Sequence, residues 1–400
     1  MGMNQTPSSE RIHIGIFGKM NVGKSSVINA ITGQDLAIVS DVPGTTTDPV
    51  YKTMELLPIG PVVIMDTPGL DDTSVLGSQR IAKTIDVLKK SDLALVVVDS
   101  NTGISDKDQF IIDDLKKRRT PFLVVLNKAD VYHAKTIECE ENHIVVSALT
   151  GFNIFELKER IGAISREAHQ EKYIVMDILK PKSYVVLVVP IDSAAPKGRI
   201  ILPQQQVLRE VLDFHGKCMV VQPEELKDLL DMMKQPPALV ITDSQVFEQI
   251  KDTVPSTIML TSFSILFARY KGNLKEVVAG ARVLKTFAEN KPIKILIAEG
   301  CTHHRQCDDI GTVKLPKWIQ KYLGHDNIEF KFTSGTGFVS DFEGIDLVVH
   351  CGGCMLNTRE MGRRIDETVL NNVPITNYGI LIAHMNGILD RSVELFASEL

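Results

Sequence analysis

Short apolar runs alternate with amphipathic stretches along most of the chain. The runs that predict buried strands are Ile12–Phe17, Val62–Met65, Phe122–Leu126, Ile144–Val146, Tyr184–Ile191, Cys218–Val221, Ala238–Thr242, Thr257–Leu260, Lys294–Gly300, Ile328–Phe332, Ile345–Val349 and Pro374–Asn377. Between several of them the apolar residues follow helical spacing, at Val27–Ile31, Pro203–Phe214, Asn273–Glu289, Pro316–Tyr322 and from Thr358 onward. Strands that alternate with helices are typical of parallel α/β sheets. We therefore predict an α/β chain of three domains, each a mostly parallel sheet with flanking helices.

The length of the chain also indicates more than one domain, because 400 residues exceed an ordinary single domain. We place a flexible tail at residues 1–10, a first domain at 11–170, a middle domain at 175–270 and a last domain at 271–400. The middle domain has strands and helices but no recognisable catalytic cluster. That combination is typical of a spacer or of a surface for assembly.

Composition narrows the class of protein. The chain is 44% hydrophobic and 24% charged, as expected of a globular protein, and its net charge of −6 disfavours a large nucleic-acid footprint. Six cysteines are too few for a disulfide scaffold and fit a reducing cytosol. No apolar run approaches the roughly 20 residues of a membrane span. The prediction is a cytoplasmic protein that binds neither nucleic acid nor membranes.

A glycine-rich loop follows the first predicted strand and precedes a helical stretch, with the sequence Gly18-Lys19-Met20-Asn21-Val22-Gly23-Lys24-Ser25-Ser26. Its spacing is that of a phosphate-binding P-loop. Glycines let backbone N–H groups wrap the phosphates, and the following helix directs its positive end at them. Lys24 is predicted to reach the β- and γ-phosphates, and the Ser25 hydroxyl to ligate Mg²⁺.

Three further motifs follow predicted strands in the order expected of a GTPase. Asp66-Thr67-Pro68-Gly69 could hold Mg²⁺ through Asp66 and sense the γ-phosphate through the Gly69 N–H. Asn127-Lys128-Ala129-Asp130 supplies a carboxylate that can accept two N–H groups of guanine, and Ser147-Ala148-Leu149 could offer a backbone N–H to its oxygen. The segment 41–48 lies where a switch loop belongs. The order and spacing of these motifs predict that the first domain binds and hydrolyses GTP.

Residues 10–165 resemble a GTPase of the Era/TrmE type, because they carry the five motifs of that family. The resemblance implies that Thr46 binds Mg²⁺, although the neighbouring threonines Thr45 and Thr47 remain possible. Leu70 stands where Ras-like enzymes have a water-orienting glutamine. Asn21 matches the loop asparagine that binds K⁺ in potassium-activated members, and a simple hydrogen-bonding role in the loop is an equal alternative.

Cysteines and histidines follow two of the predicted strands in the last domain. Cys301 and His303 come after Lys294–Gly300, and His350-Cys351-Gly352-Gly353-Cys354 comes after Ile345–Val349. Strands of one parallel sheet can bring their carboxyl ends together, so three thiols and two imidazoles converge on one point. The glycines allow the backbone to curl around a bulky centre. We predict a metal site, and the motif by itself fits either an iron–sulfur cluster or a structural zinc ion.

A GTPase domain joined to Cys-x-His and a distant His-Cys-x-x-Cys resembles the family of GTPase scaffolds that mature FeFe-hydrogenase. The resemblance implies a 4Fe–4S cluster on Cys301, Cys351 and Cys354, with a fourth ligand that is exchangeable or not a cysteine, for which His303 and His350 are the nearest candidates. It implies GTP or GDP, Mg²⁺ and K⁺ in the first domain. It also implies that the protein is a scaffold that carries a diiron precursor with CO and cyanide ligands and delivers it to the apo FeFe-hydrogenase. A homodimer formed through the middle domain is implied as well, with the apo-hydrogenase and its radical-SAM maturases as partners.

Two other readings of the sequence remain open. One is a GTPase of RNA or ribosome assembly with a structural zinc site, against which the acidic charge balance counts. The other is a nucleotide-switched interaction protein whose cysteines are inert. An anaerobic visible spectrum of the reconstituted protein separates these readings, because an iron–sulfur protein is brown and the others are colourless.

Overall fold

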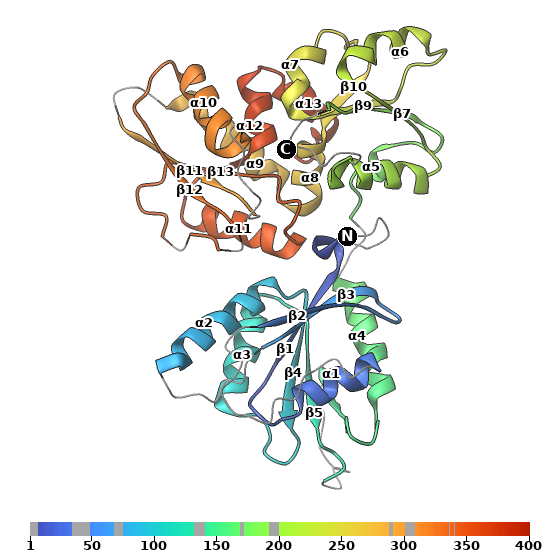
Figure 1. Cartoon of the computed structure of the whole chain (residues 1–400), viewed down its shortest axis with the longest axis vertical. Helices are drawn as coiled ribbons and strands as arrows, with labels where there is room; N and C mark the ends of the chain where they lie inside the picture. The colour runs from blue at the N-terminus through green and yellow to red at the C-terminus, as the bar shows by residue number, and fades with distance from the viewer. Residues whose placement is uncertain are drawn as a thin grey trace. The chain divides into compact units, whose positions relative to one another are not determined.

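The computed structural model describes residues 7–33, 49–67, 75–131, 141–168, 172–191, 200–287, 291–300, 309–335, 337–339 and 341–400. The chain divides into two compact units, Met1–Glu171 and Lys172–Leu400. The described parts contain three sheets, one of six strands in the first unit and two of four strands in the second (Figure 1). The predicted α/β fold class is confirmed, with the P-loop sheet first in the chain.

The six-stranded sheet of the first unit has the strand order β2-β3-β1-β4-β5-β6, and only β2 runs antiparallel to its neighbour. Its strands are β1 Ile12–Phe17, β2 Val50–Leu56, β3 Gly60–Asp66, β4 Leu93–Asp99, β5 Phe122–Asn127 and β6 His143–Val145. Its helices are α1 Lys24–Thr32, α2 Val75–Lys90, α3 Asp106–Lys117 and α4 Ile154–Ala168. Helices α1 and α4 pack into the core on one face, and α2 and α3 into the core on the other (Figure 1).

The inner strands of this sheet, β1, β3, β4 and β5, are largely apolar because both of its faces are covered, whereas the edge strand β2 is mostly exposed. Ile16 of β1 lies in the core beneath α1 and α4, whereas the next residue, Phe17, lies in the core beneath α2 and α3. Successive side chains of a strand point to opposite faces, so a sheet covered on both faces requires apolar residues at every position. The continuous apolar runs of the sequence therefore report a buried parallel sheet, whose carboxyl edge holds the P-loop and the motifs after β3 and β5.

The second unit contains two parallel sheets, with strand orders β10-β9-β7-β8 and β12-β11-β13-β14. The strands are β7 Tyr184–Val188, β8 Lys217–Val221, β9 Leu239–Thr242, β10 Met259–Ser262, β11 Ile293–Ala298, β12 Ile328–Thr333, β13 Leu347–His350 and β14 Ile375–Asn377. The helices are α5 Leu202–Asp213, α6 Leu226–Met232, α7 Phe247–Ile250, α8 Phe263–Lys271, α9 Leu274–Val283, α10 Leu315–Leu323, α11 Thr358–Leu370, α12 Tyr378–Met385 and α13 Leu389–Val393.

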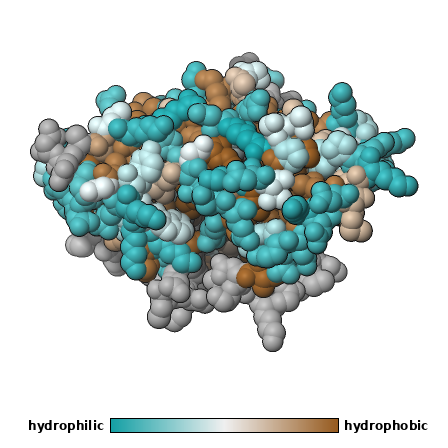
Figure 2. Space-filling view, turned by 90° about the horizontal axis from the view of Figure 1, so that it is seen from above, coloured by the Kyte–Doolittle hydropathy of each residue, from teal (hydrophilic) through white to brown (hydrophobic). Residues whose placement is uncertain are grey.

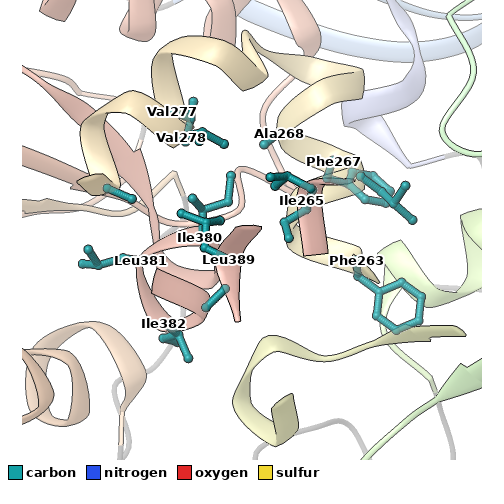
Figure 3. Close-up of a cluster of buried hydrophobic side chains, with 14 of the residues drawn as sticks. Phe263, Ile265, Phe267, Ala268, Val277, Val278, Ile380, Leu381, Ile382 and Leu389 are labelled. Carbon is teal, nitrogen blue, oxygen red and sulfur yellow. The ribbon is translucent and has the colours of Figure 1, made fainter. Parts of the chain in front are cut away.

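The two sheets of this unit share one hydrophobic core. Figure 3 shows side chains of α8, which follows the middle sheet, packed among those of α9, α12 and α13. Phe263 and Leu266 of α8 belong to the same buried cluster as Val277 of α9 and Ile380 of α12. Residues 175–270 and 271–400 therefore form one compact unit, and the domain boundary between them remains a prediction.

One predicted helix ends earlier than its pattern suggests. The spacing predicts a helix over Asn273–Glu289, but α9 ends at Val283 and a 3₁₀ turn follows at Leu284–Thr286. The Thr286 hydroxyl donates a hydrogen bond to the Val283 carbonyl at 2.7 Å, which satisfies one orphan carbonyl of the helix end. The prediction of its far end was therefore wrong.

Among the helices that the structure describes, none is long and apolar enough to cross a membrane.

Candidate nucleotide site and cysteine loop

Two glycines of the P-loop occupy positions that no other residue fits. Gly18 and Gly23 have φ angles of +141° and +91°. A Cβ atom on Gly18 would lie 2.2 Å from the Val97 carbonyl oxygen, and one on Gly23 would lie 2.4 Å from the Asn127 amide nitrogen. Both approaches are far shorter than a van der Waals contact. The loop therefore runs directly against the ends of β4 and β5, as a phosphate cradle at the sheet edge requires.

The ammonium group of Lys24, which is predicted to bind the phosphates, is held here by backbone carbonyls of the P-loop. Lys24 Nζ donates to the Gly18 and Lys19 carbonyls at 2.9 and 2.7 Å. Lys24, Ser25 and Ser26 form the first turn of α1, where N–H groups lack helical acceptors. A phosphate at this helix start would meet those N–H groups and the ammonium together.

Asp66 ends β3 beside this helix start, and one of its oxygens has no hydrogen-bond donor. Its Oδ1 is buried and unpartnered among the described residues. Burial raises the pKa of the carboxyl, and the positive charges of Lys24 and Lys52 oppose that rise. A buried carboxylate oxygen with no donor, next to a phosphate cradle, is suited to Mg²⁺ or to a water bound to it. The residues present therefore fit the predicted magnesium ion.

Asn127 joins the P-loop to the predicted guanine side of the site. It is buried, its amide nitrogen donates to the Val22 carbonyl at 3.0 Å, and its amide oxygen accepts from the Ala148 N–H at 3.0 Å. This use of the Ala148 N–H was not expected from the sequence, which assigned that region to the guanine oxygen. Asn127 thus fixes the spacing between the phosphate and base ends of the pocket.

The carboxylate that is predicted to read guanine, that of Asp130, is positioned by the next loop. The Ser147 hydroxyl donates to Asp130 Oδ1 at 2.5 Å, and the Thr150 N–H donates to the same hydroxyl at 3.1 Å. Lys128 pairs with Asp99 at the end of β4, at 2.8 Å. Leu149 is 84% exposed beside them. The structure therefore brings the motifs after β5 and β6 together at the edge that holds the P-loop.

The remaining P-loop residue with a predicted role, Asn21, is exposed and has a φ of +62°. Asparagine tolerates this left-handed conformation better than most residues, which gives a backbone reason for its presence. Several predicted site residues lie outside the described parts of the chain, namely Thr46, Gly69, Cys301 and His303, together with Leu70 and the threonines beside Thr46. Their roles remain predictions.

The cysteine loop starts where β13 ends, next to the end of β11. These strands are parallel neighbours, with Ala298 opposite His350, and the Cys351 N–H donates to the Ala298 carbonyl at 2.8 Å. The Gly300 N–H, just before the position of Cys301, donates to Cys351 Sγ at 3.1 Å. The two strand ends that carry the cysteine motifs therefore meet at one sheet edge.

Backbone N–H groups donate hydrogen bonds to the two described sulfurs of this loop. Cys351 Sγ accepts from the Gly353 N–H as well as from the Gly300 N–H. Gly353 has a φ of +62°, which permits the tight turn between Cys351 and Cys354. Burial nevertheless raises the pKa of the Cys351 thiol to about 11. Burial also raises the pKa of Cys354, against the nearby charge of Lys271. Buried sulfurs with backbone donors are typical of metal-bound thiolates, whose protons leave when the metal binds.

The described residues supply only part of a metal site. Within the described ranges, no group of three or more His, Cys, Asp or Glu side chains is arranged to hold a metal ion. Cys351 and Cys354 fit two ligands of a cluster by their spacing, burial and N–H donors. The third predicted thiol, Cys301, follows the Gly300 N–H that already contacts Cys351 Sγ.

His350 has both of its ring nitrogens engaged within the protein. It is fully buried, and Arg364 lies 3.0 Å from its Nε2. Because a guanidinium can only donate, Nε2 accepts, and Nδ1 therefore carries the proton that it donates to the Cys351 carbonyl at 2.7 Å. Burial and the charge of Arg364 lower the His350 pKa to about 4. In this arrangement His350 fixes the start of the loop, and neither of its nitrogens faces a ligand position.

Two buried cations near the loop were missed by the sequence analysis. Arg364 of α11 is fully buried and donates to His350, to Glu360 at 2.8 Å and to the Gly335 carbonyl at 3.1 Å. Lys271, the last residue of α8, is 2% exposed and donates to the Leu356 carbonyl at 3.1 Å and the Cys354 carbonyl at 3.4 Å. The sequence signal for Arg364 was its place four residues after Glu360, on the face of α11 that also carries Met361.

Comparisons with known proteins follow this division of the chain. Residues 13–128 match the family model of the 50S ribosome-binding GTPase. Residues 174–272 match the hydrogen maturase F dimerization domain, and residues 275–395 match the hydrogen maturase F tetramerization domain.

Two curated GTPases are similar to part of the chain. GTPase Der of Kosmotoga olearia is 31% identical over 176 residues, which are 40% of each protein. The tRNA modification GTPase MnmE of Nitrosomonas europaea is 39% identical over 150 residues, 36% of this chain and 33% of the relative. The chain thus spans well under half the length of these relatives. A crystal structure of Aquifex aeolicus Era is 21% identical with a TM-score of 0.33, and covers 52% of this chain and 93% of that one.

Proposed function

The chain belongs to the hydrogen maturase F (HydF) family, and on that premise we propose that it is a GTP-hydrolysing scaffold and carrier for the diiron precursor of FeFe-hydrogenase. Its first domain is a P-loop GTPase related to Der and MnmE. The two hydrogen maturase F domains that follow connect this GTPase with hydrogenase maturation. The proposed part is the cluster and its cargo. The observation that carries it is the partly buried Cys351–Cys354 turn, with backbone N–H groups directed at the Cys351 sulfur.

In the GTPase domain each described residue has a distinct task. Lys24 exchanges its bonds to the loop carbonyls for bonds to the β- and γ-phosphates, and Ser25 with Asp66 holds Mg²⁺, directly or through water. Thr46 is proposed to complete the magnesium site, and the Gly69 N–H to sense the γ-phosphate. Asp130 selects guanine over adenine because it accepts two N–H groups that adenine cannot offer.

In the last segment the chain would hold a 4Fe–4S cluster through Cys301, Cys351 and Cys354. Such a cluster with three thiolates supplies one iron that is open to an exchangeable ligand or to a cargo. The chain's own residues direct backbone N–H groups at Cys351 Sγ and fix the start of the loop through His350. Because both nitrogens of His350 are engaged, we propose His303 rather than His350 as the fourth ligand.

We also propose K⁺ as an activator of hydrolysis, with Asn21 as a ligand. Leu70 cannot orient a water molecule as a glutamine does, so hydrolysis would depend on a different group, such as a positive charge near the γ-phosphate. K⁺ held by Asn21 would supply it where other GTPases use an arginine. The left-handed backbone at Asn21 is a competing reason for the residue, and the two reasons are separable by experiment.

The middle segment is proposed to form a homodimer. Among the described strands, β8 lies at an end of its sheet and pairs with β7 alone, and its Val220 is 44% exposed. An edge strand with free backbone groups can pair with the same strand of a second copy. In the view from above, the surface is mainly hydrophilic with scattered apolar groups (Figure 2). The apo FeFe-hydrogenase and its radical-SAM maturases are the proposed further partners.

The test is anaerobic reconstitution with iron and sulfide, followed by a visible spectrum and iron analysis. We expect a brown protein whose iron content falls severely in Cys351→Ser and Cys354→Ser. Cys218→Ser is the matched control, because Cys218 is a partly buried cysteine of the middle sheet. A colourless protein that binds one zinc ion through the same cysteines would refute the cluster and favour the assembly-GTPase alternative.

A further inference from the structure

The cysteine loop is contacted by a buried lysine from a different part of the chain. Lys271 ends α8, inside the range 174–272 that matches the dimerization domain. Its ammonium reaches carbonyls 83 and 85 positions further along, those of Cys354 and Leu356. A charged side chain with 2% exposure loses its water, so its position is maintained by what it contacts in the protein.

Lys271 secures the far end of the loop, and a separate set of hydrogen bonds secures its start. At the start, Arg364 donates to His350, which in turn donates to the Cys351 carbonyl. At the far end, Lys271 donates to the carbonyl of Cys354 itself and to that of Leu356. The glycines between the two cysteines give no side-chain anchorage of their own. The loop is thus fixed by groups on either side of it, on α8 and α11.

We propose that Lys271 is a positioning residue of the metal centre, which fixes Cys354 and links the dimerization segment to the cysteine loop. The proposal rests on the proposed function for the identity of the metal centre. Its two physical parts are separate. The hydrogen bonds set where Cys354 lies, and the positive charge of an ammonium group favours a centre that carries negative charge from its thiolates.

The charge part has support in the loop itself. Lys271 Nζ lies 3.4 Å from the carbonyl oxygen of Cys354 itself, so its charge is next to the residue that would hold the metal. The same charge lies over the ring of Phe267, with Nζ 5.8 Å from the ring centroid, so the lysine is also fixed from its own helix. Any rearrangement of α8 in an oligomer would therefore move a charge and two hydrogen bonds at the loop together.

The experiment compares Lys271→Met, Lys271→Gln and Lys271→Arg with the control Lys275→Met, which removes an exposed lysine of the adjacent helix α9. After anaerobic reconstitution, each protein is challenged with a chelator and its iron loss is timed. Its reduction midpoint and the electron paramagnetic resonance spectrum of the reduced cluster are recorded. Hydrogen–deuterium exchange of residues 351–357 is measured on the apo-protein.

Lys271→Met should lose iron about 10- to 100-fold faster, the usual range for groups that support metal ligands, and its loop amides should exchange faster. Lys271→Gln keeps a donor and should recover part of the retention but not the midpoint, which falls when a positive charge is lost. Lys271→Arg should restore the midpoint. Lys275→Met should behave as the wild type.

Unchanged iron loss, midpoint and loop exchange in both Lys271→Met and Lys271→Gln would overturn the proposal. If the wild type takes up no iron, the proposed function fails, but the exchange measurement on the apo-protein still decides whether Lys271 fixes the loop. If Lys271→Met does not fold, Lys271→Gln and Lys271→Arg carry the test, and a midpoint that is equal in these two would reject the charge part.

Discussion

Asp130 is the residue proposed to recognise guanine, and Asp130→Asn tests that role with little change of shape. In the structure its carboxylate is fixed by the Ser147 hydroxyl at 2.5 Å. The substitution replaces one acceptor oxygen with a donor and removes the negative charge. One charge-assisted hydrogen bond to guanine, worth about 1.5–3 kcal/mol, is lost, and the other weakens by about 1 kcal/mol because it becomes neutral. A loss of roughly 2.5–4 kcal/mol corresponds to about 10²- to 10³-fold weaker GTP binding.

Xanthosine triphosphate should show the opposite change. Xanthine carries an oxygen where guanine has its amino group, and the asparagine amide can donate to that oxygen. The assay is displacement of a fluorescent guanine nucleotide by GTP and by xanthosine triphosphate. Asp113→Asn, which alters an exposed carboxylate of α3, serves as the control. If Asp130→Asn kept the wild-type preference for GTP, the assignment of this loop to guanine would be wrong.

Three further outcomes are expected. Asn21→Gly keeps the left-handed backbone at φ +62° but removes the amide, so it should abolish the acceleration of GTP turnover by K⁺ over Na⁺ while GTP affinity persists; unchanged K⁺ dependence would leave Asn21 a backbone role only. Gly280→Ala places a Cβ 2.0 Å from the Ile375 carbonyl oxygen and should destabilise by roughly 1–3 kcal/mol in thermal unfolding, which an unaltered melting temperature would contradict. Burial raises the Cys218 pKa to about 11, so alkylation at pH 8 should be about 100-fold slower than for an ordinary thiol and should keep rising to pH 11; a plateau near pH 9 would refute this.

The nucleotide site was predictable because its residues are contiguous motifs at strand ends. Parallel strands bring their carboxyl ends to one edge, so spacing along the chain translates directly into proximity. Asp130 and Ser147 illustrate this, since each follows a neighbouring strand and they share a hydrogen bond. The same logic placed Cys351 next to Gly300.

The supports of the cysteine loop were not predictable in this way. Lys271 and Arg364 lie on helices, where a charged residue is normally assigned to solvent. An amphipathic pattern shows which face of a helix is buried, but not the element that it packs against. The pattern therefore did not indicate that α8 and α12 would share one core.

That shared core has a consequence for synthesis. The middle sheet and α8 are complete when residue 272 is made, but their apolar partners on α12 and α13, and Phe396, come more than 100 residues later. At roughly 5–20 residues per second, the nascent segment would wait on the order of ten seconds with its apolar face uncovered. Chaperones on the ribosome would have to protect that face. Pairing of subunits through this segment would then follow release of the finished chain rather than accompany translation.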